Sequence, residues 1–137
     1  MDAGLKLEVH ELLSRAAYAL DEQDLQMLGA CFAPEAEFRM QIAGNPPIPP
    51  FVGHAAIMEL MRNSMATQTD KRRHVVSNIF FAAEGDADAR VVSNLTLFGT
   101  ENAVIRLIST ALYRDRVVRR DGRWLLAERN IELDLPY

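Results

Sequence analysis

The second half of the chain narrows the choice of fold most, because four β-prone segments follow one another there. The segments span residues 74–82, 89–98, 104–118 and 124–133. Residues 84–88 and 99–102 have the composition of turns, and Asp121–Gly122 is a hairpin signal between the last two segments. Short turns join neighbouring antiparallel strands, so this half of the chain predicts an antiparallel sheet.

The first half of the chain is predicted to be mainly helical. Residues 5–20 place their apolar side chains on one stripe and their charged side chains on the other side, which is typical of an amphipathic helix. A second, shorter helix is expected from an N-cap at Asp24 through Phe32, with Pro34 ending it. A third helix is expected over residues 53–66, where apolar residues again recur at helical spacing.

Two segments of the first half do not fit a helix. Residues 37–42 alternate polar and apolar side chains and are predicted to form a half-buried strand. Residues 44–50 contain four prolines and predict a stiff loop, either a plain surface connection or a lid or rim. The order of helix, helix, strand, helix and four strands indicates one α+β domain over residues 1–137, with a curved sheet forming a cone around the helices.

Composition disfavours several classes of protein. The net charge is −4 and no long basic block is present, which disfavours a nucleic-acid groove or a polybasic membrane patch. No apolar run approaches the ~18 residues of a membrane-spanning helix, and the N-terminus lacks the layout of a signal peptide, so we expect a cytoplasmic protein. The three histidines lack the spacing of metal ligands, and no glycine-rich phosphate loop occurs, so neither a metal nor another cofactor is predicted.

An ordered series of short motifs resembles a known family. Asp21 lies at the end of the first predicted helix, and Cys-Phe-Ala-Pro-Glu-Ala follows at 31–36. Arg-His-Val-Val-Ser-Asn stands at 73–78, and Tyr-Arg-Asp-Arg at 113–116 precedes Asp-Gly-Arg-Trp at 121–124. The series is similar to the SnoaL-like branch of the nuclear transport factor 2-like superfamily. That resemblance implies a cone-shaped α+β barrel, with three N-terminal helices against a curved, mostly antiparallel sheet.

The same resemblance implies a catalytic pair. In the enzymes of this branch an acidic residue ends the first helix and a histidine opens the strand after the third helix, and Asp21 and His74 match those positions. An aspartate that accepts from one ring nitrogen fixes the tautomer of the histidine, which leaves the other nitrogen for acid–base chemistry. Glu22 and Asp24 are alternative partners, and a purely structural role for His74 also remains open.

Further residues are candidates for the wall of a substrate pocket. Tyr18 lies one helical turn before Asp21, and Asn78 could place its amide in the cone. Several methionines cluster between positions 40 and 65, where they form either an adaptable core or a pocket. The predicted substrate-binding residues are Tyr18, Phe38, Met40, Met58, Met61 and Asn78.

Other reactive side chains are expected to have ordinary roles. His10 and His54 fall on predicted surface positions, and Cys31 is predicted to be a small buried hydrophobic residue rather than a reactive thiol. Five arginines of the strand-rich half are expected to be solvated or ion-paired rather than to bind an anion; they are Arg72, Arg73, Arg106, Arg114 and Arg116.

The resemblance leaves three functions open. The first is a small cofactor-independent lyase or isomerase, such as a dehydratase or polyketide cyclase, that acts on an apolar oxygenated molecule. The second is a non-catalytic protein like the β subunit of aromatic-ring-hydroxylating dioxygenases, which would assemble with an α subunit. The third is an accessory protein that binds a small ligand. A homodimer or homotrimer is expected, because the open sheet face of this fold usually pairs.

Overall fold

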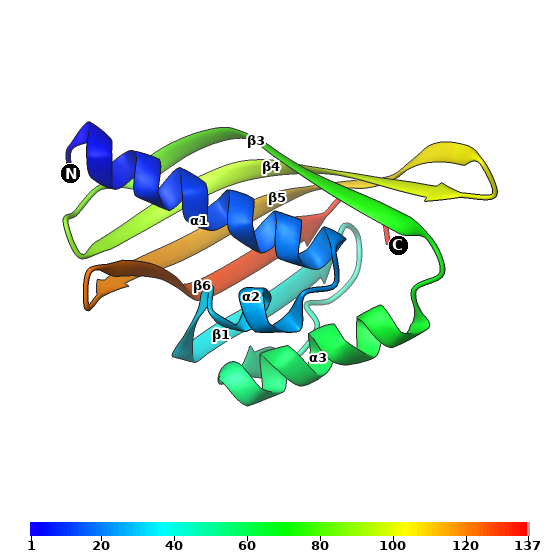
Figure 1. Cartoon of the computed structure of the whole chain (residues 1–137), viewed down its shortest axis with the longest axis horizontal. Coiled ribbons are helices and arrows are strands. Elements are labelled where there is room, and N and C mark those ends of the chain that lie inside the picture. The colour runs from blue at the N-terminus through cyan, green and yellow to red at the C-terminus, as the bar shows by residue number, and fades with distance from the viewer. Residues whose placement is uncertain (137) are drawn as a thin grey trace.

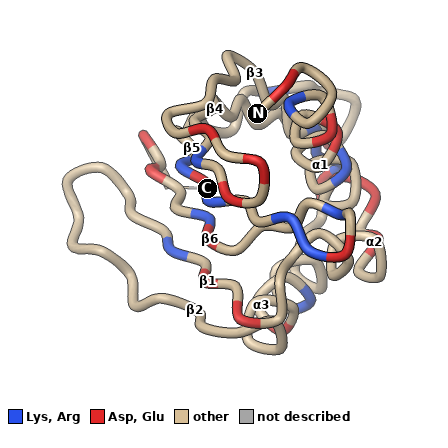
Figure 2. Tube along the Cα trace, turned by 90° about the vertical axis from the view of Figure 1, so that its left-hand side faces the viewer, with Lys and Arg blue, Asp and Glu red and all other residues tan. Residues whose placement is uncertain are grey.

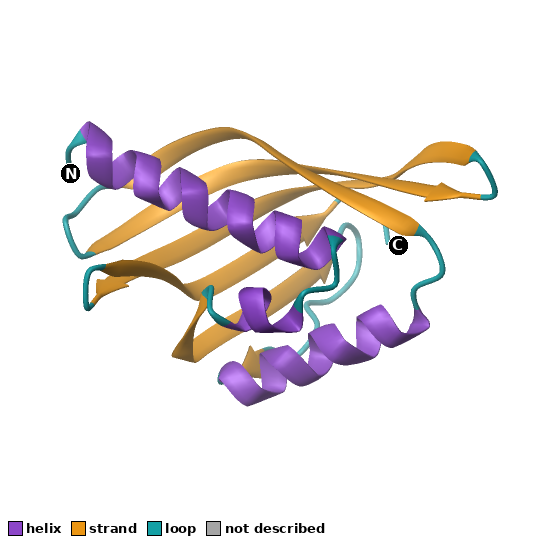
Figure 3. Ribbon diagram, viewed as in Figure 1, coloured by secondary structure: helices purple, strands orange, loops and turns teal. Residues whose placement is uncertain are grey.

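Six strands form one curved sheet, and three helices cover one of its faces (Figures 1 and 3). The structure is a computed structural model that describes residues 1–136. Its elements are α1 (Ala3–Asp21), α2 (Leu25–Gly29), β1 (Phe32–Ile42), β2 (Phe51–Val52), α3 (His54–Thr67), β3 (Lys71–Ala83), β4 (Asp88–Glu101), β5 (Val104–Arg120) and β6 (Arg123–Leu133).

The strand order is β2-β1-β6-β5-β4-β3, and neighbouring strands are antiparallel except for β1 and β6. The parallel pairing of β1 with β6 brings the strand of the first half beside the last strand of the chain. The predicted α+β class with a mostly antiparallel sheet is confirmed. None of the helices within residues 1–136 has the length and apolar character needed to cross a bilayer.

Both N-terminal helices begin at aspartate caps. Asp2 accepts a hydrogen bond from the backbone N–H of Leu5, and Asp24 accepts one from Met27, each at 2.9 Å. These bonds satisfy backbone donors that have no partner inside the helix. Helix α1 buries the predicted apolar stripe, including the fully buried Leu13, and lies across β3 on the helical side of the sheet (Figure 1).

The predicted end of the second helix was wrong. Helix α2 ends at Gly29, and both Phe32 and Pro34 belong to β1. The carbonyl of Cys31 already accepts from the backbone N–H of Leu126 in β6 at 2.7 Å, so the chain has joined the sheet. The register of β1 against β6 shifts between Phe32 and Glu37, and this irregularity accommodates a proline that has no N–H to donate.

The turns between the strands refine the predicted boundaries. Residues 99–101 continue β4 instead of turning, and the turn is Asn102–Ala103, with φ values of 52° and 61°. The predicted Asp121–Gly122 turn is confirmed, with φ values of 52° and 76°. Two-residue turns with positive φ at both positions match the twist of antiparallel strands. The two-residue strand β2 was missed because it is too short to show an alternating pattern.

The predicted proline-rich loop joins β1 to β2. Residues 43–50 contain no Lys, Arg, Asp or Glu, and the loop stands away from the rest of the chain in Figure 2. Charged residues of both signs are interspersed over the other elements (Figure 2). The eight-residue connection from β1 to β2 therefore carries no charged side chain.

The turn between β3 and β4 should not tolerate a side chain at Gly85. A Cβ atom built on Gly85 would lie 2.5 Å from the backbone oxygen of Asp88, so the turn would have to open. We expect Gly85→Ala to lower the free energy of unfolding by about 1–3 kcal/mol, as measured by urea denaturation. Gly4→Ala is the matched control, because its Cβ would make an ordinary 3.4 Å contact with Asp2. Equal stability of the two variants would contradict the prediction.

Candidate functional site

Asp21 and His74 are in direct contact, although 53 positions separate them in the chain. Oδ1 of Asp21 lies 2.6 Å from Nδ1 of His74 and accepts the backbone N–H of the same residue at 2.8 Å. Both side chains are nearly buried, with exposed fractions of 10% and 9%. Two short hydrogen bonds to one oxygen hold the imidazole in a single orientation. The structure therefore brings together the two residues predicted as the catalytic pair.

Three charged residues fix the end of α1 on the start of β3. Lys71 donates to the carbonyl of Asp21 at 3.3 Å and to the carboxylate of Glu22 at 2.8 Å. Arg73 donates to the same carboxylate at 3.3 Å. Lys71 and Arg73 lower the pKa of Glu22, chiefly through the hydrogen bond from Lys71. Glu22 is thus engaged by these two cations, and Asp24 caps α2, so neither alternative partner reaches His74.

The position of Asp21 is not explained by helix stability. Helix α1 ends at Asp21, and a negative side chain at the C-terminus of a helix is opposed by the helix dipole. Burial of the carboxylate adds a further cost unless its oxygens are hydrogen-bonded. The contacts with His74 offset both costs, which indicates that Asp21 is placed for its interaction with the imidazole.

The geometry also assigns the ring proton. An ionised carboxylate only accepts hydrogen bonds, so Nδ1 of His74 carries the proton in the contact with Asp21. In the neutral imidazole, Nε2 then has a free lone pair. His74 lines a cavity of about 100 Å³, so this nitrogen is available to a molecule bound there.

The cavity beside His74 is lined mainly by apolar side chains from the helices, β1 and β6. Its apolar wall consists of Leu20, Leu28, Phe32, Phe38, Met40, Leu60, Met61, Met65 and Ile131. The polar lining residues are Ser64, Gln68, Arg72, His74, Tyr113 and Arg129. An engineered cavity of ~150 Å³ in another protein admits benzene, so this smaller cavity of about 100 Å³ holds at most one small ring. A mostly apolar pocket with a few polar groups is the usual form of a small-molecule site.

Half of the predicted pocket residues line this cavity. Phe38, Met40 and Met61 do so together with His74. Met58 faces a different hollow, which it shares with His54 on α3. The side chain of Tyr18 is 57% exposed on the outer side of α1.

Asn78 is also outside the cavity wall. It has a positive φ of 55°, and the register of β3 against β4 shifts between Ser77 and Phe80. This irregularity interrupts the alternation that the prediction assumed. The predicted placements of Tyr18, Met58 and Asn78 in the pocket are therefore corrected.

Sequence reasoning missed a buried ion pair at the cavity. Arg129 of β6 and Asp115 of β5 lie directly opposite each other, and Nε and Nη2 of Arg129 donate to the two carboxylate oxygens at 2.9 Å. The guanidinium carbon also lies 4.0 Å from the ring centre of Tyr113. The alternation of β6 gave a signal, because Arg129 shares a face with the buried Ile131 and Leu133.

The ion pair keeps Arg129 charged inside the protein. Burial by itself would lower the pKa of Arg129, but the carboxylate of Asp115 outweighs it, so the pKa is raised above its ordinary value. Asp115 engages both Nε and Nη2, which leaves Nη1 outside the ion pair. The cavity therefore has a potential base, His74, and a fixed positive charge in its wall.

The remaining predictions for reactive side chains had mixed outcomes. The expected ion pairs are confirmed for the strand arginines; they are Arg72 with Asp70, Arg73 with Glu22, Arg106 with Asp70, Arg114 with Glu132 and Arg116 with Asp88. Cys31 is buried as predicted, and burial raises the pKa of its thiol. His10 and His54 are not simply solvated, because His10 stacks on Phe81 and Nε2 of His54 lies 2.7 Å from the carbonyl of Gly29.

Removing Asp21 should change the tautomer of His74. In Asp21→Ala no acceptor holds the Nδ1 proton, so we expect the neutral ring to lose its Nδ1–H form in favour of a mixture with Nε2–H. Long-range ¹H–¹⁵N NMR spectra at high pH measure this change. Glu22→Ala is the matched control, since the neighbouring carboxylate does not contact the ring. An unchanged tautomer in Asp21→Ala would contradict the assignment.

Comparison with known proteins identifies the family of the chain. The family model of a SnoaL-like domain matches residues 3–130, which is most of the chain. No curated protein gives a significant match. Among solved structures, a protein of unknown function with a cystatin-like fold from Nostoc punctiforme is 27% identical, with a TM-score of 0.81. That match covers 99% of this chain and 97% of the other.

Two further structures are similar over nearly their whole length. A protein from Catenulispora acidiphila in complex with S-DNPA is 26% identical, with a TM-score of 0.80 and coverage of 96% and 95% of the two chains. ActVI-ORFA from Streptomyces coelicolor is 22% identical, with a TM-score of 0.81 and coverage of 95% and 98%, and supports the fold alone. The match of the family model to residues 3–130 shows that the chain belongs to the family of SnoaL-like domains.

Proposed function

We propose that this protein is a cofactor-independent enzyme that performs acid–base chemistry on a small, mostly apolar, oxygenated molecule. His74 is the general base and acid, and Asp21 orients it. The observation that carries the proposal is the 2.6 Å contact between Asp21 and Nδ1 of His74 at the wall of an apolar cavity. The reaction class is dehydration, isomerisation or cyclisation.

The chemistry follows from His74 in the cavity wall and from Asp21, which holds its ring. Nε2 of His74 removes a proton from a carbon next to a carbonyl group, and the electron pair of the broken C–H bond forms an enolate. Asp21 stabilises the imidazolium that results. The imidazolium then returns its proton to another carbon, which isomerises the substrate, or to a leaving hydroxyl, which releases water.

Arg129 is suited to the charge that develops on the substrate. A positive group already fixed by Asp115 needs no reorganisation when an enolate oxygen becomes negative. The apolar lining restricts water, which strengthens this electrostatic interaction. We propose that the carbonyl oxygen of the substrate points to Arg129, while the acidic carbon lies beside His74.

The cavity also bears on the alternative functions. A non-catalytic protein like a dioxygenase β subunit needs no space beside His74, whereas the pocket here holds about 100 Å³. A complex of the related Catenulispora protein with S-DNPA supports ligand binding within this fold. An accessory protein that only binds a ligand would have the same cavity but would not transfer protons. Measured turnover therefore distinguishes the enzyme from the accessory protein.

The test is proton exchange at carbon. A panel of cyclic ketones in D₂O reports catalysed loss of α-proton signals by ¹H NMR, and this readout does not require the natural substrate. We expect exchange with the wild-type protein and with His54→Gln, because His54 lies outside this cavity. His74→Gln should show only the uncatalysed rate. Equal exchange in both histidine variants would overturn the proposal.

We further propose that the chain acts as a single domain in a homodimer or homotrimer. Several large apolar side chains are exposed on the strands, and self-association would cover them. They include Val75, Phe80, Val104, Ile105 and Leu107. The alternative is that a dioxygenase α subunit, and not a second copy of this chain, covers these exposed side chains.

A further inference from the structure

The cavity beside His74 contains a second arginine that the proposed proton transfer does not use. Arg129 suffices for the one oxygen that becomes negative in an enolate. Arg72 lines the same cavity, two positions before His74 on β3. Both residues pair with β4 in one unbroken register, so their side chains lie on the same face of β3 and their Cα atoms are about 7 Å apart. The wall therefore carries two cations, and only one of them has a role in the chemistry.

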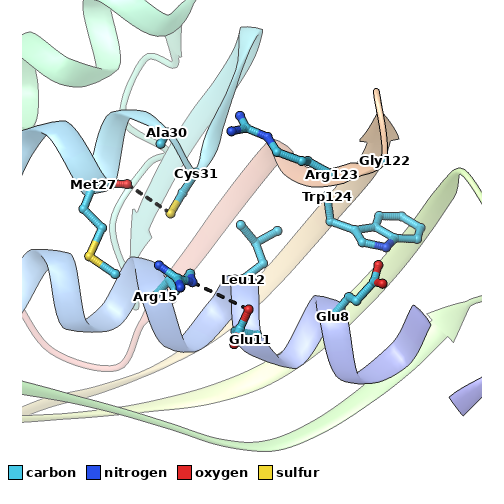
Figure 4. Close-up of a pocket in the computed structure, with 10 residues that line it drawn as sticks. All are labelled: Glu8, Glu11, Leu12, Arg15, Met27, Ala30, Cys31, Gly122, Arg123 and Trp124. Carbon is cyan, nitrogen blue, oxygen red and sulfur yellow. Dashed lines mark hydrogen bonds and ion pairs between the residues drawn. The ribbon is translucent and has the colours of Figure 1, made fainter. Parts of the chain in front are cut away.

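The lining of this cavity is cationic. Arg72 and Arg129 are its charged residues besides the titratable His74, and no aspartate or glutamate within residues 1–136 lines it. A larger hollow of about 330 Å³, between α1, the end of α2 and the turn before β6, is lined by two acidic and two basic residues, of which Glu11 and Arg15 form a pair at 3.6 Å (Figure 4). The formal charges of that hollow cancel, so it gives no comparable indication of a charged ligand.

The carboxylate next to Arg72 is shared between two arginines. Asp70 accepts from Nε of Arg72 at 3.0 Å and lies 3.5 Å from Nη2 of Arg106. Two guanidinium groups thus face one carboxylate, and the positive charge at this end of the cavity is only partly balanced. A guanidinium has five N–H donors in a planar fork, so it can bind a second carboxylate while Nε stays on Asp70.

Arg72 stands nearer to solvent than Arg129. Their side chains are 22% and 4% exposed. Ser64 and Gln68, at the C-terminal end of α3, line the cavity as well and are exposed and half-buried. Because an anion loses much free energy when it is fully removed from water, the partly hydrated Arg72 is better placed than Arg129 to bind one. The polar end of a bound molecule therefore belongs at the mouth, beside Arg72.

We propose that the substrate is a small cyclic ketone that also carries a carboxylate group. Arg72 binds the carboxylate at the mouth of the cavity, and the ring lies among the apolar side chains between His74 and Arg129. Arg72, which was expected from the sequence to be ion-paired rather than to bind an anion, here does both. This substrate class rests on the acid–base function proposed above, which supplies the positions of the ketone oxygen and the acidic carbon.

Binding tests the substrate class without turnover. 3-Oxocyclopentanecarboxylate and its neutral carboxamide contain one small ring and are nearly equal in size. Each is titrated at neutral pH while the ring C–H signals of His74, which His74→Gln identifies among the three histidines, are followed in ¹H–¹³C NMR spectra. We expect the carboxylate to bind at least ~10-fold more tightly than the carboxamide. A carboxylate that binds no more tightly, or does not bind, would overturn the proposed substrate class.

Proton exchange in D₂O separates the failure of this substrate class from the failure of the proposed function. If both ketones exchange their α-protons with equal kcat/KM, the anionic substrate is wrong and the acid–base function stands. If the carboxylate binds more tightly but neither ketone exchanges, the proposed chemistry is wrong and Arg72 remains the site of an anionic ligand.

Arg72→Gln tests which cation binds the carboxylate. The ratio of the two dissociation constants is compared within each variant, so a general loss of affinity cancels. We expect the preference for the carboxylate to disappear in Arg72→Gln and to persist in part in Arg72→Lys, which keeps the charge. Arg62→Gln is the matched control, because Arg62 lies on α3 and lines a different hollow. A preference that Arg72→Gln leaves intact would overturn the role of Arg72, and the wild-type comparison does not depend on the folding of any variant.

Discussion

Asp115→Asn is expected to lower the free energy of unfolding by about 3–5 kcal/mol, because it leaves the charge of Arg129 buried without its counter-ion. The exposed fractions of the two side chains are 0% and 4%, and two hydrogen bonds of 2.9 Å join them. Little water reaches the pair, and a neutral asparagine cannot balance the charge of the guanidinium. Urea denaturation at neutral pH measures the loss.

A surface pair of the same chemistry is the control. Asp88 accepts from Nε of Arg116 through both oxygens, but the two side chains are 51% and 34% exposed. Asp88→Asn should cost no more than about 1 kcal/mol, since exposed pairs contribute little. Similar losses in Asp88→Asn and Asp115→Asn would contradict the role assigned to burial.

A double variant that removes both charges distinguishes the effect of an unpaired charge from the effect of lost packing. Asp115→Leu with Arg129→Met removes both charges, and we expect it to be more stable than either single variant. The comparison distinguishes an uncompensated charge from a simple loss of packing. A double variant that is less stable than both single variants would show that shape, and not charge, dominates at this position.

The fold was largely predictable because its strongest signals are local. Alternating apolar residues predict the strands, and two-residue turns such as Asp121–Gly122 predict that consecutive strands pair with each other. The errors arise where contacts between residues far apart in the sequence determine the structure. Pro34 is a helix breaker by its local chemistry, but pairing with β6 places it in an irregular part of β1. The pairing of β1 with β6 joins segments some 90 positions apart, and no local pattern reports it.

The candidate site was predictable only in part. Motif resemblance selected Asp21 and His74, and the structure places them in contact. The prediction that Tyr18 lines the pocket was wrong because Tyr18 and Asp21, three positions apart on α1, differ by about 60° in direction. That rotation takes the side chain from the covered face of α1 to solvent. Arg129 was missed although it interrupts the apolar face of β6, because arginine is seldom fully buried without a partner, and the sequence does not show that Asp115 lies opposite it.

Replacing His74 should have the largest effect on activity. His74→Gln keeps a polar side chain of similar size but cannot accept and return a proton near neutral pH. We expect kcat for α-proton exchange of the best ketone to fall by about 10²–10⁴-fold, the usual contribution of general acid–base catalysis. KM should change little, because the wall of the cavity is mostly apolar and remains intact. His54→Gln controls for the loss of a partly buried histidine elsewhere.

Two substitutions of Asp21 divide its role into charge and orientation. Asp21→Asn retains an oxygen that can accept both the backbone N–H and Nδ1–H of His74, but it removes the charge that stabilises the imidazolium. Asp21→Ala removes both. We therefore expect kcat to fall in the order wild type, Asp21→Asn, Asp21→Ala, with the last no worse than His74→Gln because the two residues act as a unit. If Asp21→Asn kept the full wild-type rate, the carboxylate would only orient the ring of His74. The imidazolium of His74 would then need no stabilisation from the negative charge of Asp21.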